Sequence, residues 1–137
     1  MLHRQRGTAI VETKKGILVV SGHGRIFTLP GGAANHKESR FQAAIRELQE
    51  ETRLVAKCAF VLFRHVGKVH RSYSGRYFRD YHTVVYIEAD GIPHPKHEIK
   101  YVAYYTPRAG AEISNTTREI IERYYEYKKV ECLDDSK

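Results

Sequence analysis

Residues 32–54, GAANHKESRFQAAIRELQEETRL, mark the point where the periodicity of the sequence becomes helical. Phe41, Ala44, Ile45 and Leu48 occupy the i, i+3, i+4 and i+7 positions of an apolar helical stripe. The spacing therefore predicts an amphipathic α-helix over residues 38–52, with one face available for packing and the other polar.

Three carboxylates lie beside this apolar stripe. At about 100° per residue, Glu47, Glu50 and Glu51 fall within one sector of the helix. Like charges at these spacings cost about 0.2 to 0.5 kcal/mol per pair, and a divalent cation would relieve the repulsion. Carboxylate oxygens suit a hard cation such as Mg²⁺. Because Arg46 and Arg53 are close in sequence, an ordinary solvated helix face remains the alternative reading.

The loop before the helix adds to the case for a binding site. Pro30 ends a predicted strand over residues 25–29, and Gly31 and Gly32 follow it. Glycine allows the backbone to come close to a metal ion or a phosphate group. The sequence therefore predicts that this turn delivers backbone atoms to the start of the helix.

The rest of the chain reads as strands with one further helix. Residues 17–20 and 25–29 are expected to form a hairpin after a first strand over residues 8–12, and the long strand over residues 55–66 is expected to pair with residues 82–89. A short strand over residues 101–105 precedes a helix capped by Ser114 or Asn115. This order predicts a mixed sheet with helices packed on it.

Composition limits the class of protein. The chain has 137 residues, of which 42% are hydrophobic, so a single domain over residues 1–137 is expected. A net charge of +7 favours anionic partners. No apolar run approaches the roughly 20 residues of a membrane span, no signal peptide is recognisable, and the 2 cysteines are too few for a disulfide framework. We therefore expect a cytoplasmic protein that does not insert into a membrane.

The spacing Gly32, five residues, Glu38, seven residues, then Arg46 to Leu54 resembles the Nudix box of the Nudix hydrolase family. The family pattern is G-x5-E-x7-R-E-U-x-E-E-x-G-U, in which U is a bulky aliphatic residue. A pattern with this many residues at fixed spacing is far more specific than a lone glycine motif. The resemblance implies an α+β fold, the Nudix α/β/α sandwich, in which a mixed β-sheet is packed between helices.

The resemblance also implies an activity and a set of site residues. Nudix hydrolases use Mg²⁺ or Mn²⁺ to direct water onto phosphorus in a nucleoside diphosphate linked to another moiety, which implies a small, anionic, nucleotide-derived substrate. At the matching positions of the box, the resemblance implies that Glu47, Glu50 and Glu51 are metal ligands, with the carbonyl of Gly31 as a further one. Glu38 and Arg46 form a pair that holds loop and helix together.

The general base of Nudix hydrolases is a glutamate in the box or on a loop beyond it, so the resemblance implies such a residue here. Glu47 is the first candidate and Glu98 is the candidate outside the box, while Glu88 and Glu112 also remain open. The sequence departs from the pattern at Arg53, which stands where the family has glycine. If a left-handed conformation is kept there, arginine costs on the order of 1 kcal/mol.

Outside the box, residues 64–82 alternate basic and aromatic side chains. Packing within a sheet is the favoured reading of this stretch, and binding of phosphates and bases is the other. The alternative function is accordingly a Nudix-fold module that binds a nucleotide or RNA without turnover, with nucleic acid the less expected partner. The aromatic face of the last helix is expected to cover the sheet and is also compatible with a homodimer contact. Neither the substrate nor the oligomeric state follows from the sequence.

Overall fold

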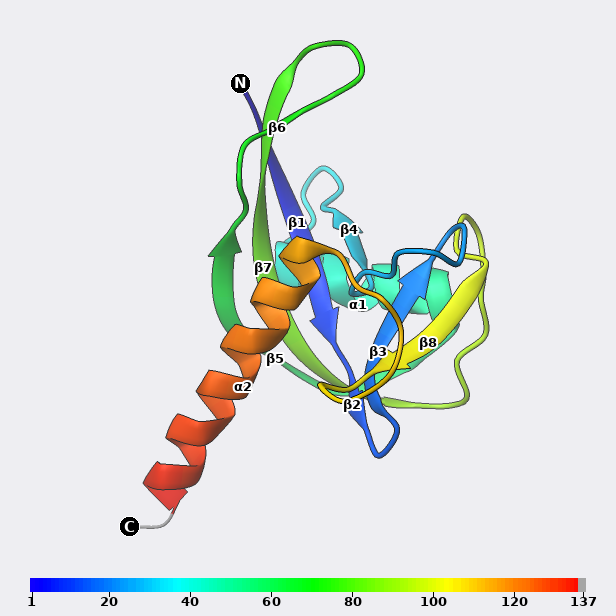
Figure 1. Ribbon diagram of the computed structural model, residues 1–137, viewed down its shortest axis with the longest axis vertical. Helices are drawn as coiled ribbons and strands as arrows, with labels where there is room; N and C mark the ends of the chain where they lie inside the picture. Colours follow the sequence, from blue (N-terminus) through cyan, green and yellow to red (C-terminus); the bar gives the residue numbers. More distant parts are fainter. Residues whose placement is uncertain (136–137) are drawn as a thin grey trace.

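The computed structural model describes residues 1–135, and their side chains as far as Val130. Figure 1 shows two sheets with one helix behind them and one in front. The elements in chain order are β1 (Leu2–Ile10), β2 (Glu12–Thr13), β3 (Gly16–Ser21), β4 (Gly31–Ala33), α1 (Arg40–Thr52), β5 (Val55–Val66), β6 (His70–Arg71), β7 (Tyr77–Asp90), β8 (Tyr101–Tyr105) and α2 (Asn115–Asp135).

The larger sheet is mixed and has the strand order β4-β1-β7-β5, with β6 paired to β7. β1 runs parallel to β7, whereas β4 and β5 are antiparallel to their neighbours. In the parallel register Arg6 lies opposite His82. The smaller sheet is antiparallel and has the order β2-β3-β8. The parallel pair joins segments more than 70 residues apart and places the N-terminal strand in the middle of the larger sheet.

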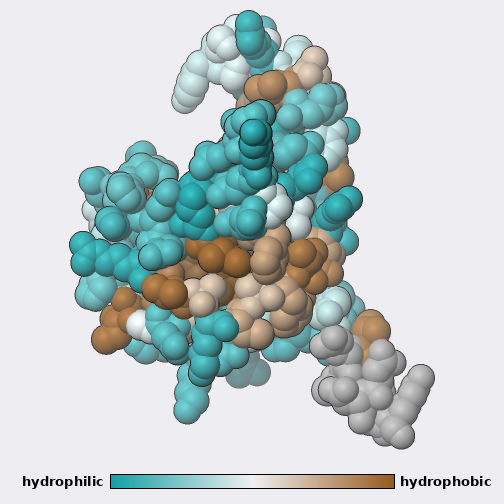
Figure 2. All heavy atoms as spheres, turned by 180° about the vertical axis from the view of Figure 1, so that it is seen from behind, coloured by the Kyte–Doolittle hydropathy of each residue, from teal (hydrophilic) through white to brown (hydrophobic). Residues whose placement is uncertain are grey.

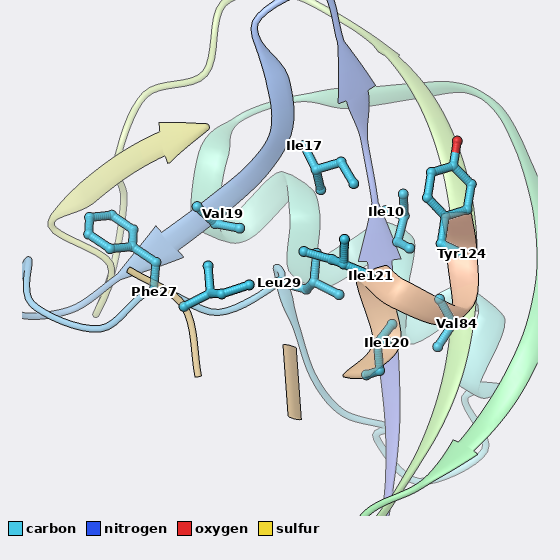
Figure 3. Close-up of a cluster of buried hydrophobic side chains, with 10 residues drawn as sticks. Ile10, Ile17, Val19, Phe27, Leu29, Val84, Ile120, Ile121 and Tyr124 are labelled. Atoms are coloured by element: carbon cyan, nitrogen blue, oxygen red, sulfur yellow. The ribbon is translucent and has the colours of Figure 1, made fainter. Parts of the chain in front are cut away.

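Strand alternation divides the core into two clusters, one on each side of the sheets. Ile10 and Val84 belong to the cluster that also contains Ile120 and Ile121 of α2, and Figure 3 shows these side chains together. The strand neighbours Ala9 and Val85 belong to a second cluster with Ala44 and Leu48 of α1. Each strand therefore contributes one residue to each cluster in turn, which is the arrangement of an α/β/α sandwich.

α1 has well-defined ends. The Ser39 side chain accepts a hydrogen bond from the Gln42 N–H and the Gln42 side chain accepts one from the Ser39 N–H, forming a capping box. The predicted start at residue 38 was therefore two residues early. At the other end, Arg53 is left-handed, with φ 66° and ψ 4°, and its N–H donates to the Gln49 carbonyl. The structure thus keeps at Arg53 the conformation that favours glycine.

The strand expected over residues 25–29 is not formed. Phe27 and Leu29 are buried as alternation suggested, but this segment makes only isolated bridges, from Thr28 to Val20 and from Phe27 to Ile113. Its backbone hydrogen bonds are divided between β3 and the segment before α2, so no continuous ladder develops. β5 and β8 have the expected bounds, whereas β7 begins five residues earlier than expected, at Tyr77.

The surface is mostly hydrophilic, with an apolar band across the face seen in Figure 2. Several exposed apolar side chains belong to β5, at one edge of the larger sheet: Val55, Phe60 and Val61 are each about half exposed. Nothing in the structure tests the homodimer contact with which the aromatic face of the last helix is compatible. Within residues 1–135 no helix combines the length and apolar character that a membrane span requires.

Candidate active site

Three glutamates converge at one end of α1. Glu47 and Glu51 come from consecutive turns of the helix, and Glu98 comes from the segment between β7 and β8. Each offers a carboxylate oxygen, and these oxygens lie within 4.8 Å of one another. Like charges at this separation repel, so the arrangement stores electrostatic energy that a cation would release.

Glu51 occupies the most confined position of the three. It is only 5% exposed, and its carboxylate accepts a 2.9 Å hydrogen bond from the Gly31 N–H. Burial, the largest cause, together with the charges of Glu47 and Glu98, raises the pKa of Glu51 from 4.5 to about 8. The Gly31 hydrogen bond and the positive charge of Arg6 act in the opposite direction but do not offset burial.

Close approach of β4 to α1 explains the glycine that begins the box. A Cβ on Gly32 would lie 2.5 Å from Cδ of Glu47 and 2.8 Å from both of its carboxylate oxygens. Any side chain at this position would displace the Glu47 carboxylate. Gly31 is equally constrained, because its Cβ would lie 2.4 Å from the Gly7 carbonyl oxygen of β1. The two glycines therefore allow the strand to pass between β1 and the acidic cluster.

The segment that carries Glu98 is tied to the end of α1. The N–H of His94 donates to the Thr52 carbonyl at 2.9 Å, and the N–H of Lys96 donates to the Glu51 carbonyl at 3.0 Å. These bonds use carbonyls that the last turn of a helix leaves unpaired. Ile99 is buried next to Glu98 and anchors the segment from the other side. The backbone thereby positions an exposed carboxylate beside Glu47 and Glu51.

Arg46 ties the loop before α1 to the helix. Its guanidinium binds the Glu38 carboxylate through two hydrogen bonds, of 2.7 and 3.0 Å, and also donates to the Ala33 carbonyl at 3.1 Å. The same side chain donates to Glu47 at 2.8 Å and to Glu50 at 3.0 Å. These contacts raise the pKa of Arg46, and the Arg46 guanidinium lowers the pKa of Glu38. Glu38 and Arg46 are both largely shielded from solvent.

The other predicted acidic residues lie elsewhere. The Glu50 side chain is 46% exposed, binds Arg46 and is not part of the group formed by Glu47, Glu51 and Glu98. Glu88 lies on β7 near Lys57, with 3.8 Å between the charged atoms, and Glu112 is exposed in the segment before α2. The structure thus brings Glu98 to the box helix and leaves Glu88 and Glu112 outside the cluster.

A cleft of about 380 Å³ opens next to Glu51 and Glu98. Strands β1 and β7 contribute Arg4, Arg6 and His82 to its lining. Arg4 is paired with a carboxylate, since its guanidinium binds Asp80 at 2.6 and 2.9 Å and lies 4.2 Å from the centre of the Phe78 ring. The cleft therefore has an acidic wall and a basic wall.

His82 is neutral at pH 7. Burial, followed by the charge of Arg6, lowers its pKa from 6.5 to about 4. Its Nδ1 lies 2.8 Å from the Thr8 hydroxyl, while its Nε2 is buried and has no hydrogen-bond partner among the described residues. Neither Arg6 nor His82 was singled out as a site residue from the sequence. The available signal was the alternation of Arg4, Arg6 and Thr8, which share one face of β1.

The basic and aromatic stretch at residues 64–82 forms the end of β5, β6, the start of β7 and the loops between these strands. Several of its rings take part in contacts within the sheet: His70 stacks on Phe78, and the Tyr81 hydroxyl lies 2.7 Å from Nδ1 of His3. Tyr73 is fully exposed. These contacts agree with the reading of the alternating aromatic residues as sheet packing.

The donor set of the acidic cluster fits a divalent cation. All three side chains offer oxygen, and one of them is a buried carboxylate whose ionisation is suppressed. Mg²⁺ and Mn²⁺ prefer such ligands. A positive ion there would offset the free-energy cost of ionising a buried carboxylate and would reduce the repulsion between the carboxylates. The cluster can therefore hold a hard divalent metal ion.

Comparisons with known proteins identify the family. The model of a family described as NUDIX domain matches residues 1–134. A nudix hydrolase family member from Chromobacterium violaceum is 35% identical, with a TM-score of 0.73 over 92% of this chain and 78% of that chain.

More distant structures share the fold. A MutT NUDIX hydrolase from Burkholderia pseudomallei is 18% identical, with a TM-score of 0.69 over 89% of this chain and 98% of that one. An ADP-ribose pyrophosphatase from Streptococcus suis is 15% identical, with a TM-score of 0.58 over 83% and 81% of the two chains. No curated protein matches the sequence significantly. With the family model and the 35% identical structure in agreement, the chain belongs to the Nudix family, whose hydrolases act on pyrophosphate bonds.

Proposed function

We propose that this protein hydrolyses a phosphoanhydride bond in a nucleoside diphosphate linked to another moiety, using Mg²⁺ or Mn²⁺. The observation that carries the proposal is the group formed by Glu47, Glu51 and Glu98, whose carboxylate oxygens lie within 4.8 Å of one another beside a cleft with a basic wall. Phosphoryl chemistry requires a protein mainly to position the reactants and to offset negative charge. The carboxylate group could hold a cation that offsets negative charge, and the cleft beside it could position the substrate.

In this proposal Glu47 and Glu51 hold the cation from the rigid helix, with the Gly31 carbonyl as a further ligand. Glu50, which accepts a 3.0 Å hydrogen bond from Arg46, would be a further ligand. When bound, the divalent cation supplies activation of water and compensation of phosphate charge. Arg46 keeps Glu47 oriented through its 2.8 Å contact and, through Glu38, keeps the preceding loop against the helix.

The proposed general base is Glu98, with Glu47 as the alternative. One oxygen of Glu47 already accepts a hydrogen bond from Arg46 and is therefore occupied in this arrangement. The Glu98 side chain has no hydrogen bond or ion pair within the part of the chain that the structure describes, and it is exposed to solvent. A carboxylate on a tethered loop beside the cation can take a proton from an attacking water molecule and release it to solvent.

The test is phosphate release, with coupling enzymes where needed, across a panel of substrates. The panel contains nucleoside triphosphates, dinucleoside polyphosphates, ADP-ribose, nucleotide sugars and RNA with a 5′ triphosphate or cap. Each is assayed with Mg²⁺, with Mn²⁺ and with EDTA. The expected result is turnover of one class that EDTA abolishes and that Glu51→Gln reduces by about 10²-fold or more.

Two further variants make the assay specific. Glu98→Gln is expected to lower kcat with little effect on metal affinity, whereas Glu126→Gln, an exposed change of the same charge on α2, should leave turnover unchanged. Ligand binding that persists in EDTA without turnover of any substrate would overturn the proposal. That outcome would favour a Nudix-fold module that binds nucleotide or RNA.

A further inference from the structure

Arg6 is a half-buried arginine on β1 whose guanidinium has no hydrogen-bond partner among the described residues. It lines the same cleft as Glu51 and Glu98, yet it makes no hydrogen bond or ion pair with any described residue. Removing a cation from water costs free energy unless polar or charged partners replace the solvent. A guanidinium held in this position is therefore prepared to bind an anion that enters the cleft.

Arg4 and Arg6 differ in their partners, although they share one wall of the cleft. Arg4 lies two residues earlier on β1 and so on the same face of the strand. Two of its N–H groups donate to Asp80, whose carboxylate balances the charge of Arg4. Arg6 lies opposite His82 in the sheet, and neutral His82 does not compensate its charge. Of the two arginines on this wall, Arg4 has a hydrogen-bonded carboxylate and Arg6 has none among the described residues.

His82 supplies a second polar group without a partner on the same wall. Its Nδ1 is engaged by the Thr8 hydroxyl at 2.8 Å, and its Nε2 is shielded from solvent without a hydrogen-bond partner in the described chain. Because a buried polar atom without a partner is rare, this nitrogen also indicates a contact with a ligand. Arg6 and His82 come from adjacent strands, so a single group can contact both.

We propose that Arg6, assisted by His82, binds a phosphate group of the substrate in the cleft beside the carboxylates. A guanidinium binds phosphate oxygens through two parallel hydrogen bonds. This inference rests on the proposed hydrolysis and adds to it a residue that sets substrate affinity. The site then favours anhydrides that carry a phosphate group within reach of Arg6, and this one contact does not require the metal.

A competing explanation is that Arg6 acts only through Glu51, whose ionisation its charge favours. The two explanations differ when metal is removed. If Arg6 contacts phosphate, its loss weakens the binding of an inorganic polyphosphate in EDTA. If it acts only on Glu51, its loss alters metal affinity and leaves polyphosphate binding without metal unchanged.

The experiment is calorimetric titration of the full chain with tripolyphosphate in EDTA. Arg6→Ala is compared with Arg108→Ala, which removes the same charge from an exposed position outside the cleft. We expect Arg6→Ala to weaken binding by about 10- to 100-fold, Arg6→Lys to lie between it and the wild type, and Arg108→Ala to bind like the wild type. Circular dichroism and thermal melting establish that each variant is folded.

Equal affinities for Arg6→Ala and Arg108→Ala would overturn the inference, as would failure of the folded wild type to bind tripolyphosphate. In steady-state turnover of the substrate found in the panel, Arg6→Ala is expected to raise KM more than it lowers kcat. Because the titration does not depend on turnover, it can refute the role of Arg6 while hydrolysis stands. Absence of turnover in the wild type would refute the proposed function separately.

Discussion

Replacing Arg53 by glycine should stabilise the protein. Arg53 ends α1 in the left-handed region, with φ 66° and ψ 4°, and its exposed side chain has no hydrogen bond or ion pair among the described residues. A residue with a Cβ pays roughly 1 to 2 kcal/mol in that region. Glycine avoids this cost but loses about 0.4 to 1 kcal/mol through the greater freedom of its unfolded chain. We expect Arg53→Gly to raise the free energy of unfolding by about 0.5 to 1 kcal/mol.

The assay is urea denaturation and thermal melting of matched variants in the absence of divalent metal. For a chain of this size the gain corresponds to an increase in Tm of roughly 2 to 4 °C. Arg53→Ala is the control, because it removes the same charge and side chain but keeps the Cβ. Arg53→Asn should lie between alanine and glycine, since asparagine tolerates the left-handed region better than most residues.

The order of the three variants separates backbone strain from charge. If only the charge of residue 53 mattered, Arg53→Ala and Arg53→Gly would change the free energy of unfolding equally. A free energy of unfolding for Arg53→Gly equal to or below that of Arg53→Ala would refute the argument from strain. Metal-dependent turnover should be retained in Arg53→Gly, because the N–H of residue 53 still donates to Gln49.

Three further predictions follow from the packing and charge of the site. Gly32→Ala should lower turnover by about 100-fold in a folded protein, because the new Cβ displaces the Glu47 carboxylate; unchanged kcat would contradict the close approach. Gly7→Ala should lower the free energy of unfolding by on the order of 3 kcal/mol in urea denaturation, because its Cβ would lie 2.2 Å from the Arg40 carbonyl oxygen of α1. Folding raises the pKa of Glu51 from 4.5 to about 8, so its stabilising contribution is complete below pH 4.5 and is lost as the pH rises through 8. In EDTA the stability of the wild type should therefore fall relative to Glu51→Gln between pH 5 and pH 9, by on the order of 2 kcal/mol, and parallel pH profiles would contradict this.

The box helix is the part of the fold that the sequence predicts best. The positions of Ala44 and Leu48 define the buried stripe, and the departure at Arg53 correctly indicates a left-handed residue at the helix end. Both features depend on residues close together in sequence. The prediction of a strand over residues 25–29 was wrong for a related reason. The alternating burial of Phe27 and Leu29 is typical of a strand, but whether a β-ladder forms depends on hydrogen bonds to segments distant in sequence.

The basic wall of the cleft could not be predicted in the same way. Arg6 and His82 meet only because β1 runs parallel to β7, a pairing of residues 76 positions apart that no local pattern encodes. Glu98 could be named as a candidate but not placed, since its position depends on two backbone hydrogen bonds from its segment to the end of α1. Residues joined by long-range pairing thus complete a site that the sequence indicated only on its helical side.

Titration of the free protein with Mn²⁺, followed by electron paramagnetic resonance, tests most directly whether the acidic cluster is a metal site. The wild type should bind Mn²⁺, while Glu47→Gln and Glu51→Gln should weaken binding by at least about 10-fold. Glu126→Gln, which removes an exposed charge on α2, should bind like the wild type. Wild-type affinity in Glu51→Gln would contradict the metal site and, with it, the proposed mechanism.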